Sequence, residues 1–60
     1  MWNAIWVTAD FAQANEVMQA IRKLNILTKC RKFEDSGQNF YEILVPSAEK
    51  AVALDMLAEI

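Results

Sequence analysis

Two stretches of the chain, residues 2–8 and residues 39–45, carry apolar side chains at both odd and even positions. In the first stretch Trp2 and Trp6 occupy even positions and Val7 occupies an odd one. Successive residues of a strand point to opposite faces of a sheet, so the pattern predicts two strands that are apolar on both faces. A small domain covers one face of its sheet with its own helices. The second apolar face therefore indicates a partner or a ligand.

An amphipathic helix is predicted over residues 10–24, because apolar residues recur there at helical spacing. Asp10 and Gln13 have the spacing of a capping box, in which Asp10 accepts a hydrogen bond from the Gln13 amide. Asn25 can end the helix, since asparagine tolerates the left-handed conformation that a helix C-terminus often needs. The apolar face of this helix consists of Ala14, Val17, Met18, Ile21 and Leu24.

A second helix is predicted over about residues 48–58. Pro46 stops the strand before it, and Ser47 has a side chain suited to an N-cap. The apolar face of this helix consists of Val52, Ala53, Met56, Leu57 and Ile60.

The segment between the two helices predicts a β-hairpin. Residues 26–34 form a weaker strand, and residues 35–38 have turn chemistry, with Gly37 at the position that needs a positive φ. The turn sets how the two strands pair, since a slip of one residue would reverse every side chain of the first strand. In the resulting register Phe33 opposes Phe40, Arg31 opposes Glu42, and Cys30 opposes Ile43.

The order of elements is β-α-β-β-α in one domain, residues 1–60. A right-handed crossover makes the first two strands parallel, and the third strand lies between them, antiparallel to both. The predicted fold class is α+β: a ferredoxin-like unit that lacks its last strand, with a three-stranded sheet of order 1-3-2 and two helices on one face. The strand that is missing would pair with residues 2–7, which are left as an open apolar edge.

The sheet face away from the helices is the main candidate for binding. It is expected to carry Trp2, Trp6, Phe33, Phe40 and Leu44, with Arg31 and Glu42 as a cross-strand ion pair. Such aromatic residues fit the centre of a homodimer, a small-molecule or peptide site, or simple packing. We favour self-association into a homodimer or higher oligomer, because a chain this short buries only about 60 % of its unfolded surface.

Five of the six basic residues lie between positions 22 and 32, although the formal net charge is −2. Such a cluster can mark an anion-binding or nucleic-acid surface. Alternatively, the first two complement the C-terminal end of the helix dipole and the others lie on a strand beside acidic neighbours. We favour this alternative, since the chain is acidic overall and lacks the aromatic motifs of RNA-recognition folds. The five residues are Arg22, Lys23, Lys29, Arg31 and Lys32.

Few residues suit catalysis or metal binding. The chain has no His, one Gly and one Cys, which excludes a histidine-assisted nucleophile, a Gly-rich phosphate loop and a cysteine metal site. No carboxylates are paired for acid–base work. Cys30 lies beside Lys29 and Arg31, which favour a thiolate, yet its place opposite Ile43 predicts a buried structural thiol. We therefore expect a non-enzymatic protein without a metal or cofactor.

No apolar run is close in length to the ~20 residues that a helix needs to span a bilayer. The first residues lack the basic and apolar regions of a signal peptide. Together with the single cysteine, these features predict a cytoplasmic protein.

Three short motifs are spread over nearly the whole chain: Trp6-Val7-Thr8-Ala9, Leu24-Asn25-Ile26, and Ile43-Leu44-Val45-Pro46 leading into Ala48-Glu49-Lys50-Ala51. In these motifs the chain resembles a small bacterial family of signal-transducing proteins, which are related in fold to the nitrogen-regulatory PII proteins. Many members of that family have Gly at the position of Asn25. The resemblance implies a regulatory or sensory role without catalytic residues. The long loop on which PII-like signalling depends is missing here.

Overall fold

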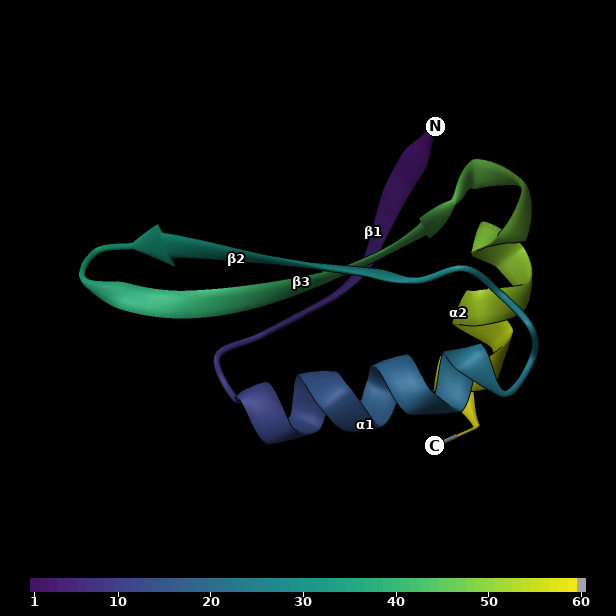
Figure 1. The fold of residues 1–60 in the computed structure, drawn as a ribbon, viewed down its shortest axis with the longest axis horizontal. Coiled ribbons are helices and arrows are strands. Elements are labelled where there is room, and N and C mark those ends of the chain that lie inside the picture. Colours follow the sequence, from purple (N-terminus) through teal and green to yellow (C-terminus); the bar gives the residue numbers. More distant parts are fainter. Residues whose placement is uncertain (60) are drawn as a thin grey trace.

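The computed structural model describes residues 1–59 and forms a three-stranded sheet packed against two helices (Figure 1). The strand order is β1-β3-β2, and the central strand β3 is antiparallel to both neighbours. The predicted α+β arrangement and strand order are therefore confirmed. The elements are β1 (Trp2–Thr8), α1 (Phe11–Arg22), β2 (Lys29–Asp35), β3 (Gln38–Pro46), the 3-10 turn η1 (Ser47–Glu49) and α2 (Lys50–Ala58).

The hydrophobic core lies between the sheet and the helices. Helix α1 contributes most of it, because its apolar residues recur on one side at helical spacing. Ile43 and Val45 come from β3, two positions apart and therefore on the same face. The buried residues are Ala14, Val17, Met18, Ile21, Ile26, Ile43, Val45 and Ala53. Strand β2 supplies none of them.

Helix α1 begins as the sequence predicts and ends slightly earlier. Asp10 Oδ1 accepts hydrogen bonds from the amides of Ala12 (2.9 Å) and Gln13 (3.4 Å). In a full capping box the Gln13 side chain would accept a hydrogen bond from the Asp10 amide. Here the Asp10 amide donates to Thr8 Oγ1 instead. The helix ends at Arg22, and Asn25 has a φ of 62°, the left-handed conformation expected of it.

The β2–β3 hairpin turns through a two-residue loop, Ser36 and Gly37, whose φ angles are 54° and 79°. Positive φ at both positions is the geometry of a tight hairpin turn whose twist matches that of its strands. Every predicted cross-strand pair is present, including Phe33 with Phe40 and Cys30 with Ile43. The register prediction is confirmed, although the loop itself is shorter than the four residues expected.

Ser47 does not cap the second helix. Its backbone N–H and its Oγ donate to the Met1 carbonyl at 2.8 and 2.9 Å, and its Oγ accepts from Asn3 Nδ2. Ser47 therefore links the start of β1 to the end of β3 through hydrogen bonds. Helix α2 begins three residues later, at Lys50. On the predicted apolar face of α2, Ala53 is buried but Val52 is half-exposed. Ile60 lies outside the described residues.

Candidate interaction surface

A β-bulge in β1 decides which side chains face the helices. Ala4 pairs with Leu44, but Trp6, two residues later, pairs with Ile43, so Ile5 is the extra residue. A bulge of this kind reverses the faces of all residues beyond it. Trp6 thus shares the helix side with the buried Ile43, and Val7 moves to the opposite face. The prediction that Trp6 lies on the same face as Trp2 is wrong.

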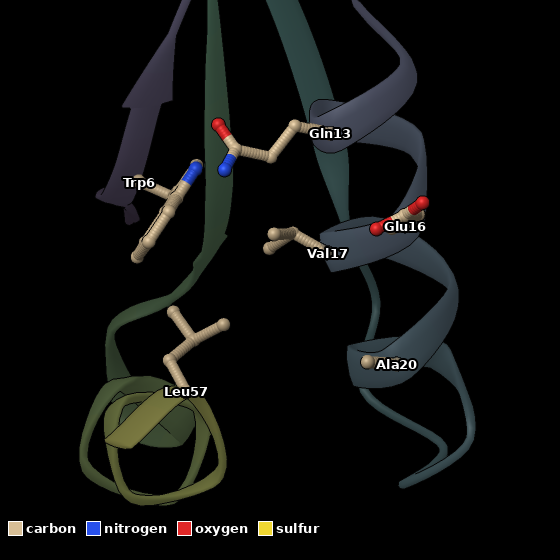
Figure 2. Close-up of a pocket in the computed structure, with 6 residues that line it drawn as sticks. All are labelled: Trp6, Gln13, Glu16, Val17, Ala20 and Leu57. Atoms are coloured by element: carbon tan, nitrogen blue, oxygen red, sulfur yellow. The ribbon is translucent and has the colours of Figure 1, made fainter. Parts of the chain in front are cut away.

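Trp6 lines a groove of about 510 Å³ between β1, α1 and α2 (Figure 2). The volume is within the range of small-molecule sites, but the groove lies on the helix side of the sheet, away from the predicted binding face. Its other lining residues are Gln13, Glu16, Val17, Ala20 and Leu57. Within the described residues, the buried Trp6 Nε1–H has no hydrogen-bond partner. Figure 2 shows this nitrogen directed toward the Gln13 carboxamide, whose Oε1 accepts from Thr8 Oγ1 at 2.6 Å.

Replacing Gln13 with Glu is expected to stabilise the fold by about 1 kcal/mol. A carboxylate has two acceptor oxygens, so one can keep the Thr8 contact while the other accepts from the Trp6 indole. It also places a negative charge in the first turn of α1, which holds no acidic residue. Urea denaturation of Gln13→Glu and of Gln19→Glu measures the effect. Equal stability of the two variants would contradict the predicted contact, since Gln19 is an exposed position of the same helix.

The sheet face away from the helices, here called the open face, is apolar and aromatic in part. Phe33 and Phe40 are half-buried and stack with ring centroids 5.6 Å apart. Trp2 is 37 % exposed, with Lys29 Nζ 4.6 Å from its ring centroid. Val7 is 51 % exposed. From the strand pairing, the open face consists of Trp2, Ala4, Val7, Lys29, Arg31, Phe33, Asp35, Gln38, Phe40, Glu42, Leu44 and Pro46.

An ion pair occupies the middle of the open face. Arg31 Nη2 lies 2.9 Å from Glu42 Oε1, and the two side chains are 66 % and 17 % exposed. The pair sits between the Phe33–Phe40 stack on the turn side and Leu44 on the other. All the predicted open-face residues except Trp6 are therefore brought together. Val7 and Lys29 join them, and the sequence carries no signal for Val7 because the bulge contains no glycine.

The basic residues do not form one continuous patch. Arg22 and Lys23 end helix α1, whereas Lys29 and Arg31 belong to the open face. Lys32 opposes Tyr41 and points to the helix side of the sheet. The basic cluster in the sequence is thus divided between a helix end and two faces of a strand.

Cys30 is exposed, contrary to the prediction of a buried thiol. Its register opposite Ile43 is correct, but the core lies over β3 and does not extend across the edge strand β2. Tyr41, on the same side of β3, is instead covered by Phe11, with ring centroids 5.2 Å apart. The prediction failed because it assumed that the helices shield all three strands.

The native protein is expected to react with a thiol reagent in a one-to-one ratio at Cys30 without prior unfolding. Cys30→Ser should change the free energy of unfolding by less than about 0.5 kcal/mol, as is usual at exposed positions. Absorbance of the released thiol product and urea denaturation measure the two effects. A thiol that reacts only in denaturant would restore the buried assignment.

Within residues 1–59, neither a metal centre nor a membrane-spanning helix is found. Across residues 1–59, no three or more His, Cys, Asp or Glu side chains gather in a way that could hold a metal ion. In the same range, no helix combines the length and apolar character needed to cross a bilayer.

Comparison with known proteins adds no relative. No protein-family model, curated protein or solved structure matches the chain. The resemblance to the PII-related signalling family stays a prediction.

Proposed function

We propose that this protein is a non-enzymatic interaction module that forms a homodimer or higher oligomer through its open face. The observation that supports this proposal is the open face itself. On this side of the sheet, away from α1 and α2, Trp2 and Val7 are exposed and the Phe33–Phe40 stack is half-buried. Aromatic side chains and arginine are enriched at protein interfaces. A regulatory role, as the family resemblance implies, would act through this surface.

The edges of the sheet are less suitable for association than its face. Strand β1 carries the bulge at Ile5, which distorts the hydrogen-bonding edge. Strand β2 carries Lys29, Arg31 and Lys32. Bulges and lysines are the devices that discourage strand addition at an edge. Face-to-face packing of two sheets is therefore favoured over extension of one sheet.

The nucleic-acid alternative, using the basic segment 22–32, gains no support from the geometry. Lys32 and Arg31 lie on opposite faces of β2, and Arg31 is paired with Glu42. A continuous basic surface, which phosphate binding requires, is not formed by these side chains.

At about 100 μM, native mass spectrometry and light scattering are expected to give a dimer or higher oligomer for the wild type and a monomer for Phe40→Glu. The new carboxylate would be buried without a partner at the interface. Val52→Glu is the matched control, because Val52 is 50 % exposed on α2 and lies off the open face. A monomeric wild type would overturn the proposal, and so would loss of association by Val52→Glu with none by Phe40→Glu.

A further inference from the structure

We infer that the β2–β3 part of the open face is covered by a second copy of this chain, related by a two-fold axis that runs between β2 and β3 and parallel to them. Arg31 of each copy then contacts Glu42 of the other. This inference rests on the proposed function and adds the geometry of its interface.

The pairing of β2 with β3 makes the hairpin self-complementary. On the open face, Lys29 lies beside Leu44, Arg31 beside Glu42, and Phe33 beside Phe40. A two-fold axis between the two strands exchanges their positions across the interface. Arg31 of one copy therefore faces Glu42 of the other, so opposite charges meet. In the same way, Phe33 of one copy faces Phe40 of the other.

A two-fold axis that crosses the strands is electrostatically unfavourable. An axis that crosses the strands at right angles, at the level of Glu42 on the central strand, brings the two Glu42 carboxylates face to face. It also places the Phe33–Phe40 stack over the end of the partner that carries Lys29. Like charges facing one another at an interface are strongly disfavoured. Charge complementarity thus favours the axis between β2 and β3 over the crossing axis.

The observed ion pair leaves room for a second contact. Arg31 is 66 % exposed and meets Glu42 through one nitrogen and one oxygen. A guanidinium has five N–H donors, and a carboxylate has two acceptor oxygens. Two copies can therefore form a four-membered network of alternating charge, flanked by four phenyl rings from the two Phe33–Phe40 stacks. Charge-assisted contacts of this kind strengthen when water is excluded around them.

Glu42→Gln distinguishes the two axes by the sign of its effect. With the axis parallel to the strands, the substitution removes two contacts between the chains and should raise the dimer Kd about tenfold or more. With the crossing axis, it removes a repulsion and should tighten the dimer. Sedimentation over a concentration series measures Kd, and circular dichroism checks that the monomer remains folded. An unchanged or lower Kd would overturn the inference.

A mixing experiment tests the charges directly. Arg31→Glu and Glu42→Arg should each be monomeric alone, since four like charges would meet in their dimers. A one-to-one mixture should give a heterodimer of intermediate mass by native mass spectrometry, because opposite charges then face one another. Homodimers of either variant would overturn the inference. A wild type that is a monomer overturns the proposed function as well, whereas a wild-type dimer insensitive to these changes overturns only the two-fold geometry.

Discussion

Trp6→Glu is expected to unfold the protein, not to dissociate a folded dimer. The bulge at Ile5 turns Trp6 to the helix side, where it packs against the core and its Nε1 is buried. A carboxylate placed there has no positive partner among the lining residues of the groove. Burying an unpaired charge costs several kcal/mol, and a chain of this size is stable by only about 3–9 kcal/mol.

Far-UV circular dichroism and thermal melting at low micromolar concentration test this result. Trp2→Glu is the matched control, because Trp2 belongs to the open face and is 37 % exposed. It should remain folded and lose only the association. A Trp6→Glu variant that is monomeric, folded and as heat-stable as the wild-type monomer would show that Trp6 faces the interface.

Ile43→Ala is expected to remove about 2–5 kcal/mol of stability and leave a substantial unfolded fraction at room temperature. Ile43 is fully buried on the central strand, between Trp6 on β1 and Cys30 on β2. Its removal leaves a cavity that the paired strands cannot close. Urea denaturation gives the loss. Leu27→Ala is the control, since Leu27 is 72 % exposed and should change stability by less than about 0.5 kcal/mol. Similar losses in both variants would contradict the assigned core.

Local chemistry accounts for the parts of the fold that could be predicted. The helical spacing and the Asp10 cap predicted α1, and Asn25, three residues beyond its last residue, has the expected left-handed conformation. Gly37 permitted the tight turn, from which the β2–β3 register followed. Strand order followed from the handedness of the crossover. Each of these features depends on a few residues close in sequence or on a general rule of chain topology.

The bulge could not be predicted, because it reflects how β1 pairs with a strand more than thirty residues away in the chain. No glycine or proline marks Ile5, and a regular strand satisfied the sequence pattern equally well. The consequence for the candidate site was large: Trp6 lies on the helix side instead of the predicted open face, and Val7 lies on the open face instead. The exposure of Cys30 and the hydrogen bonds of Ser47 could not be predicted for the same reason. Both depend on which distant segments lie against these residues.

The sequence by itself determined the elements, their order, the hairpin register and the presence of more apolar surface than two short helices can cover. Only the tertiary structure decided which aromatic residues form that surface. The physical reason is the two-residue period of a strand: one extra residue in β1 exchanges its two faces without altering composition or hydrophobic pattern. Phe33, Phe40 and Leu44 kept their predicted places because the local turn set their register, whereas Trp6 depended on a pairing between distant strands.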